Sequence, residues 1–90
     1  MAEAIITFKL MMESPDTDIE AVKAKAKDVL TKLGAEVGKE EIEPVAFGLK
    51  ALKLVVVANE DLGTDEMETK LNELEHVSSA EVVDYRRALG

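Results

Sequence analysis

The residues that could do chemistry in this chain are few, and their spacing argues against catalysis. His76 is the only histidine, and its acidic neighbours Glu73 and Glu75 lie within three residues of it at the end of a predicted helix. We therefore expect a solvated histidine and no metal site. The serines have no GxSxG context, and the chain contains no GxGxxG or GxxxxGK[ST] loop. The sequence predicts no catalytic residue and no cofactor.

Two other features are better suited to binding a partner. Phe47 precedes Gly48 at a predicted connection, and its ring is either a core residue or an exposed interface anchor, because buried aromatic rings dominate both situations. The last predicted strand ends on the adjacent Arg86 and Arg87. A cationic chain end can reach into a cleft of a partner that a packed strand cannot enter. The acidic segment 60–75 is most simply a solvated helix face.

Apolar periodicity predicts the elements that position these residues. Residues 3–12 alternate between apolar and mixed positions, which predicts a strand. A turn cluster at residues 13–16 precedes an amphipathic helix. We expect Thr17, three residues before Glu20, to cap this helix, and Gly34 to end it.

The second half of the chain predicts an edge strand, a central strand, a helix and a final strand. Residues 37–47 are acidic and include Pro44, which cannot donate a ladder hydrogen bond, so a strand there belongs at a sheet edge. Residues 49–58 form the most apolar run and predict a central strand. Thr64 is the expected cap of the second helix, and residues 80–85 are the expected last strand. The buried stripe of that helix is expected to be Met67, Leu71 and Leu74.

The resulting order, βαββαβ, predicts an α+β fold. It is typical of a ferredoxin-like sandwich, in which a four-stranded antiparallel sheet carries two helices on one face and has its first and third strands in the middle. The other face of the sheet is then half apolar and could dock a partner, although such faces are common. On it we expect Ile5, Thr7, Lys9, Met11, Ala51, Lys53, Val55 and Val57.

Composition limits the class of protein. Ninety residues, 47% of them hydrophobic and 33% charged, fit one globular domain over residues 1–90. A net charge of -8 and three aromatic residues argue against nucleic acid and anionic membranes as partners. The loop after the first strand lacks the arginine that an acylphosphatase needs. The absence of cysteine and of an apolar export or spanning segment leads us to expect a cytoplasmic protein.

One stretch of the sequence is familiar. The segment PVAFGLKALKL at residues 44–54, followed by LGTD at residues 62–65, closely resembles the guanine nucleotide exchange domain of translation elongation factor 1-beta in its short archaeal form. The resemblance covers essentially the whole chain. It implies a ferredoxin-like fold and a factor without bond chemistry of its own. Such a factor promotes release of GDP from elongation factor 1-alpha, so that GTP and then aminoacyl-tRNA can bind. We expect it to act as a monomer.

The resemblance also implies roles for four residues. Phe47, beside Gly48, matches an aromatic that inserts into the GTPase on the side near its switch region. Eukaryotic members end with a lysine that reaches toward the magnesium site, and its nearest counterpart here is Arg86 or Arg87. Arginine and lysine differ in geometry and hydration, so the same displacement of the metal is not assumed.

The alternative function is that of a small ferredoxin-like domain that senses a metabolite or binds another protein.

Overall fold

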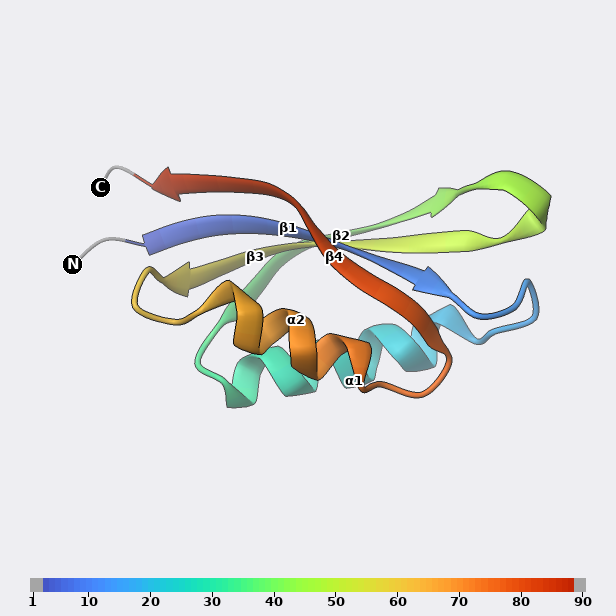
Figure 1. The fold of residues 1–90 in the computed structure, drawn as a ribbon, viewed down its shortest axis with the longest axis horizontal. Helices are drawn as coiled ribbons and strands as arrows, with labels where there is room; N and C mark the ends of the chain where they lie inside the picture. The colour runs from blue at the N-terminus through green and yellow to red at the C-terminus, as the bar shows by residue number, and fades with distance from the viewer. Residues whose placement is uncertain (1–2, 89–90) are drawn as a thin grey trace.

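The helices and strands of this chain form one sheet that is covered on one face by two helices. The computed structural model describes residues 3–88 (Figure 1). Its elements are β1 (Glu3–Met12), α1 (Ile19–Lys32), β2 (Glu36–Pro44), the short helix η1 (Ala46–Gly48), β3 (Lys50–Asn59), α2 (Thr64–Asn72) and β4 (Val77–Ala88). The strands lie in the order β2-β3-β1-β4, and all neighbours are antiparallel. The predicted ferredoxin-like α+β fold is confirmed.

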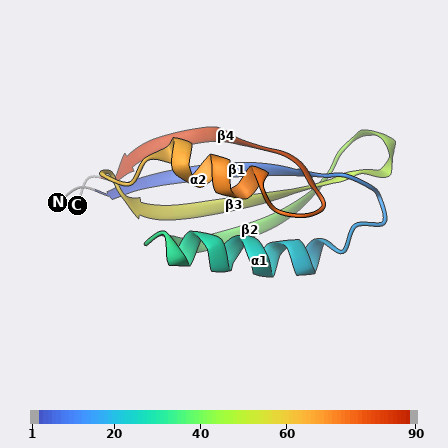
Figure 2. The ribbon, with the colours of Figure 1, turned by 60° about the horizontal axis from the view of Figure 1, so that its bottom comes forward.

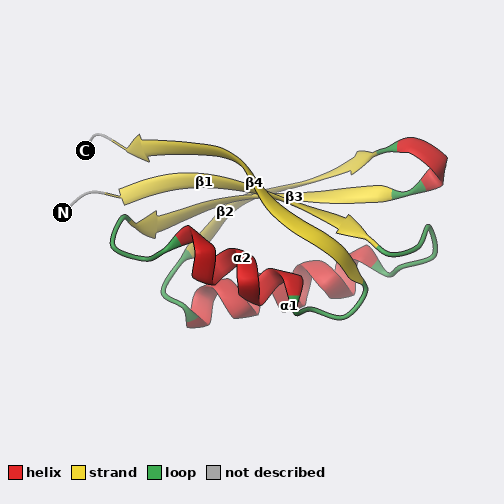
Figure 3. Cartoon of the chain, in the orientation of Figure 1, coloured by secondary structure: helices red, strands yellow, loops and turns green. Residues whose placement is uncertain are grey.

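The position of each strand follows from its residues. The apolar β1 and β3 occupy the middle of the sheet, and the acidic β2, which ends at Pro44, forms an edge, as predicted. Both helices cover the same face (Figures 2 and 3). Alternation along β1 places its even-numbered residues on that face, and all five are buried. The largest fully buried side chains are Phe8, Ile6, Leu10, Leu30, Leu52, Leu54, Met67, Leu71 and Val56.

The start of α1 differs from the prediction by one residue, and its end agrees. The cap is Asp18, whose Oδ1 accepts a hydrogen bond from the N–H of Ala21 at 3.3 Å. Thr17 instead belongs to the preceding turn, because its N–H donates to the carbonyl of Ser14. At the other end Gly34 has φ 97°, and the amide of Ala35 donates to the carbonyl of Leu30 at 2.9 Å. This is the helix stop that the glycine predicted.

The start and end of α2 also differ from the prediction. The cap is Gly63, which has no side chain to bond the first turn, and Thr64 is the first helical residue. The helix ends at Asn72, so Leu74 lies beyond it, half-buried against the core. The predicted burial of Met67 and Leu71 is confirmed.

Two expectations about the sheet need correction. The last strand is longer than residues 80–85, so Arg86 and Arg87 lie within β4, and residues 89–90 lie outside the described part of the chain. Ala51 was expected on the exposed face but is fully buried. It lies between Met11 and Glu43 in the sheet register, and its methyl group is shorter than both neighbours. None of the helices within residues 3–88 is long and apolar enough to cross a membrane.

Candidate functional site

The tip between β2 and β3 presents an aromatic ring to solvent. Phe47 is 94% exposed and has φ 63° and ψ 28°. Gly48, the next residue, has φ 75°. The turn is closed by the amide of Val45, which donates to the carbonyl of Leu49 at 2.9 Å. Of the two placements that the sequence left open for Phe47, the structure contradicts the core residue and shows an exposed ring.

The backbone of Phe47 is strained, and its ring gains no burial in return. The left-handed region costs a residue with a Cβ about 1–2 kcal/mol relative to ordinary helical backbone. Apolar side chains normally stabilise a protein by leaving water, and this one remains almost entirely in water. The stability of the free chain therefore does not explain the strained backbone and the exposed ring of Phe47.

The tip lies beside the loop that joins β1 to α1. A Cβ added at Gly48 would lie 4.0 Å from the Cβ of Pro15 in that loop. The loop is attached in turn to the α2–β4 connection, because the amide of Glu13 donates to the carbonyl of His76 at 3.0 Å. His76 is exposed, and no group of three or more potential metal ligands gathers within residues 3–88. Phe47 thus projects from a tip that has a neighbouring loop behind it.

The two arginines point to opposite faces of the sheet. Arg86 lies opposite Ile5 on the open face, and Arg87 lies opposite the buried Ala4 on the face that carries the helices. Each forms an ion pair within the chain. The Nε of Arg86 is 3.0 Å from Oδ2 of Asp84, and the Nε of Arg87 is 3.2 Å from Oε2 of Glu60, in the β3–α2 loop. Both arginine side chains remain more than two-thirds exposed.

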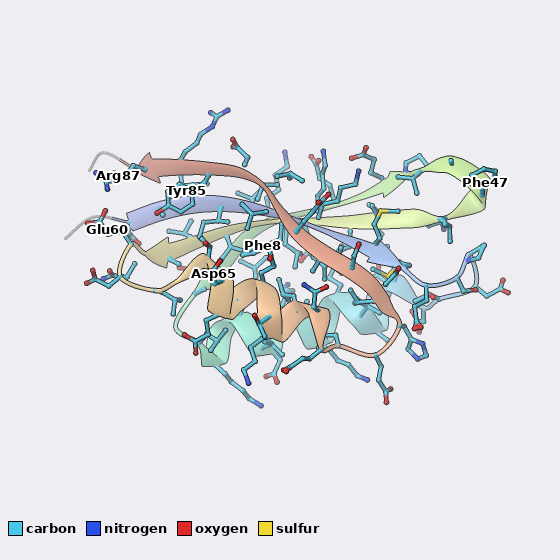
Figure 4. All side chains as sticks on the ribbon, viewed as in Figure 1. Phe8, Phe47, Glu60, Asp65, Tyr85 and Arg87 are labelled. Carbon is cyan, nitrogen blue, oxygen red and sulfur yellow. The ribbon has the colours of Figure 1, made fainter. Side chains whose placement is uncertain are left out.

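Phe47 and the arginines lie at opposite ends of the molecule. Arg87 and Ala58 both lie opposite Ala4, so Arg87 is level with the far end of β3, whereas Phe47 lies just before β3 begins. The eight steps from Lys50 to Ala58 span about 26 Å at roughly 3.3 Å per residue. The molecule is 42 Å long, and Figure 4 shows Phe47 at one end and Arg87 with Glu60 at the other. The structure does not gather these residues into a single patch.

The open face of the sheet carries ion pairs and no aromatic ring. Phe8 is buried, Phe47 lies at the tip, and Tyr85 lies opposite Ile6 on the helix-covered side. Glu43 Oε2 is 2.9 Å from Nζ of Lys53, and this hydrogen bond and charge lower the pKa of Glu43 and raise the pKa of Lys53. Without stacking rings, the face lacks the usual platform for single-stranded RNA.

A second charge cluster joins β2 to α1 on the helix-covered side. The Oε2 of Glu40 is 3.2 Å from Nζ of Lys27, and its Oε1 is 3.5 Å from Nζ of Lys23. The hydrogen bond that Lys27 donates lowers the pKa of Glu40, and the hydrogen bond that Lys23 donates to Glu20 raises the pKa of Lys23. These groups hold an edge strand to a helix, which is a structural role.

Sequence reasoning missed the residues that surround the arginines. Tyr85 is 48% exposed beside them, and Glu60 and Asp84 are their ion-pair partners. The spacing of Asp84 and Arg86 on one face of a strand was visible in the sequence. No sequence signal could identify Glu60, because its distance from Arg87 depends on the register of β4 against β1.

Comparisons with known proteins agree with this fold. The model of the EF-1 guanine nucleotide exchange domain family matches residues 5–88. The chain is 42% identical over 90 residues to "Elongation factor 1-beta" of Methanothermobacter thermautotrophicus, with 99% of this chain and 100% of that relative covered. It is 41% identical over 90 residues to the protein of the same name from Methanobrevibacter smithii, with 99% and 100% covered.

Among solved structures, a chain titled "BlrP1 BLUF" has a TM-score of 0.62 and 12% sequence identity, with 100% of this chain and 57% of that chain covered. At this identity the likeness concerns the fold alone. The family match spans nearly every described residue, including the tip and both arginines. The chain therefore belongs to the EF-1 guanine nucleotide exchange domain family and has a guanine nucleotide exchange role in translation elongation.

Proposed function

We propose that this chain acts on the GTPase elongation factor 1-alpha in the cytoplasm, promotes release of its GDP, and performs no bond chemistry of its own. It does so by binding the nucleotide-free GTPase more tightly than the GDP-bound form. By linkage, each tenfold preference weakens GDP tenfold, which is about 1.4 kcal/mol of coupling. The relatives named elongation factor 1-beta support this choice of partner.

The observation that carries the proposal is the exposed, strained Phe47. A ring that is 94% exposed contributes little to the stability of the free protein. In a partner's pocket the same ring would bury most of its apolar surface, which is the usual source of a dominant contact at an interface. Its tip has left-handed backbone at two successive residues, Phe47 and Gly48, so the ring is presented before the partner arrives. Less ordering is then required on binding.

We propose that the arginine end is the second contact. Ion pairs between exposed side chains contribute only about 0–1 kcal/mol, so Arg86 and Arg87 can exchange their internal partners for groups of the GTPase at little cost. Because this end is about 26 Å from the tip at roughly 3.3 Å per residue, both ends cannot act at one magnesium site. Because the arginines are cationic, we propose that they act on the phosphate side of the GTPase, where Mg²⁺ neutralises the nucleotide. Phe47 then makes an apolar contact elsewhere on the GTPase.

We propose that one copy of the chain is sufficient for these contacts. Both contact ends belong to the same sheet, and Phe47, Arg86 and Arg87 are all exposed on a single chain. A net charge of -8 also makes two copies repel each other at low salt.

The test is release of labelled GDP from the purified GTPase. We expect the wild-type chain to accelerate release, and Phe47→Ala and the double variant Arg86→Ala/Arg87→Ala each to slow it tenfold or more, a loss of about 1.4 kcal/mol of coupling. Ile42→Ala is the matched control, because Ile42 is also an exposed large hydrophobic residue but lies within β2, opposite Leu52, and not in the tip or at the arginine end. It should retain the wild-type rate.

Two results would count against the proposal. A wild-type chain that does not accelerate GDP release would overturn the exchange function for this GTPase. Normal rates in both variants, with circular dichroism showing intact folding, would instead remove these three residues from the mechanism and leave the function standing.

A further inference from the structure

The two edges of the sheet are protected in different ways. An edge strand presents backbone N–H and C=O groups that face away from the sheet and can pair with another chain. The β2 edge is interrupted by a register shift between Val37 and Lys39, carries Glu40, which is paired with lysines of α1, and ends at Pro44, which has no N–H. These are common devices against strand addition.

The first half of the β4 edge is occupied by side chains of α2. The amide of Asn72 donates from Nδ2 to the carbonyl of Ala80 at 3.0 Å, and its Oδ1 accepts from the N–H of Ala80 at 2.9 Å. The Oε2 of Glu68 accepts from the N–H of Val82 at 3.3 Å. The Ala80 carbonyl and the N–H groups of Ala80 and Val82 therefore face outward from the sheet. Side chains of α2 already satisfy these three groups.

The second half of the β4 edge is open within the described residues 3–88. The even-numbered residues of β1 from Ala4 to Leu10 lie opposite Ala80, Val82, Tyr85 and Arg87. In an antiparallel pair, alternate residues point their backbone groups away from the neighbour. The register of β1 with β3 has no shift, so the even-numbered residues of β1 all point their backbone groups toward the same neighbouring strand. Ala80 and Val82 lie opposite two of these residues and face outward. Tyr85 and Arg87 lie opposite the other two, so they face outward as well. Within residues 3–88, no side chain hydrogen-bonds to the backbone of either residue.

The side chains along this open segment favour an acidic partner strand. It contains the only two arginines of the chain, and both are more than two-thirds exposed. Val83 and Tyr85 are 46% and 48% exposed, so apolar surface lies beside the two arginines. Arg86 is on the open face and Tyr85 on the other, as described above. An added strand would therefore alternate acidic side chains facing Arg86 with apolar ones facing Tyr85.

We propose that the outer edge of β4 from Val83 to Ala88 accepts an extended, acidic segment of the GTPase as a fifth strand of the sheet. This rests on the proposed function and specifies how its arginine end is bound. Main-chain hydrogen bonds to Tyr85 and Arg87 supply the register, and the arginines supply the preference for acidic residues. The α2 side chains on Ala80 and Val82 set the limit beyond which the added strand cannot extend.

Hydrogen exchange of single amides tests the proposed hydrogen bonds directly. In the free chain the amides of Tyr85 and Arg87 should exchange rapidly, whereas those of Asp84 and Arg86, which face β1, should be protected. Adding the nucleotide-free GTPase should slow exchange at Tyr85 and Arg87 tenfold or more. Unchanged exchange at both amides in a formed complex would overturn strand addition.

A proline pair tests the same bonds by mutation. Tyr85→Pro removes an N–H that β1 does not use, and Ile42→Pro removes the corresponding outward N–H on the β2 edge, where the residue is similarly exposed. We expect Tyr85→Pro to weaken binding of the nucleotide-free GTPase tenfold or more, and Ile42→Pro to leave it unchanged. Tyr85→Ala, which keeps the N–H, should lose less than Tyr85→Pro.

The outcomes separate the two proposals. If the wild-type chain does not promote GDP release, the proposed function fails. If it does, and Tyr85→Pro folds and binds as tightly as Tyr85→Ala, strand addition is wrong while exchange stands. If Tyr85→Pro does not fold, the exchange rates of the wild-type amides decide the question alone.

Discussion

Replacing Phe47 with asparagine should stabilise the free protein while weakening exchange. Phe47 has φ 63°, a conformation that costs a residue with a Cβ about 1–2 kcal/mol, and asparagine tolerates it much better than other non-glycine residues. The ring is 94% exposed, so removing it forfeits only a small part of the roughly 1.5–3 kcal/mol that full burial of a phenylalanine would supply. The relief of strain should therefore exceed the lost burial.

The expected gain is about 0.5–1 kcal/mol, which corresponds to a rise in Tm of roughly 2–8 °C for a domain of this size. Urea unfolding followed by circular dichroism measures it as a higher midpoint with an unchanged slope. Phe8→Ala provides the contrast, because Phe8 is fully buried and its truncation should cost about 3–5 kcal/mol.

A decrease of more than about 0.5 kcal/mol in the free energy of unfolding of Phe47→Asn, the size of an ordinary surface effect, would contradict this prediction. That result would mean that the ring makes stabilising contacts in solution, or that its backbone is not left-handed. If Phe47→Asn is more stable than wild type and also slows GDP release, Phe47 lowers the stability of the wild-type chain because exchange requires the ring.

Three further predictions concern stability. Gly48→Ala should cost about 1 kcal/mol in urea unfolding, and the cause would be its φ of 75° alone, because Pro15 Cβ at 4.0 Å leaves room for a methyl group; no loss would argue against the left-handed tip. Asn72→Ala should cost about 1–2 kcal/mol, because it removes both hydrogen bonds to Ala80, and exchange of the Ala80 amide should accelerate; an unchanged amide would contradict those bonds. Because the pKa values of Glu40 and Glu43 are lowered from 4.5, their ion pairs stabilise the fold above that pH and lose this effect as the pH falls below it. Between about pH 5 and about pH 3, the urea midpoint should therefore fall less in Glu40→Gln/Glu43→Gln than in wild type. An equal fall in both proteins would exclude these ion pairs as a cause of the lost stability.

The strands and helices were largely predictable because their signals are local. Alternating apolar residues identified β1, the unbroken apolar run identified β3, and Pro44 placed β2 at an edge. The helix caps were less predictable, since Thr17 and Asp18 are both capping residues and only the preceding turn decides between them. The length of β4 was also missed, because residues past Tyr85 are polar and pair with β1 only through the register.

Half of the candidate site was predictable because its signals are also local. A phenylalanine beside a glycine at a connection pointed to Phe47, but its exposure depends on a backbone conformation that neither residue specifies alone. The arginine pair was visible in the sequence, yet the sequence suggested one cationic tip. Strand alternation directs the two arginines to opposite faces instead.

The sequence by itself determined the order of the elements, the composition of the core and the acidic character of the molecule, because periodicity and charge are properties of neighbouring residues. The tertiary structure decided that Phe47 and the arginines lie at opposite ends, that Glu60 binds Arg87, and that α2 covers only the first half of the β4 edge. Each of these depends on strand register and on the packing of a helix against a sheet, which bring together residues that are distant in sequence.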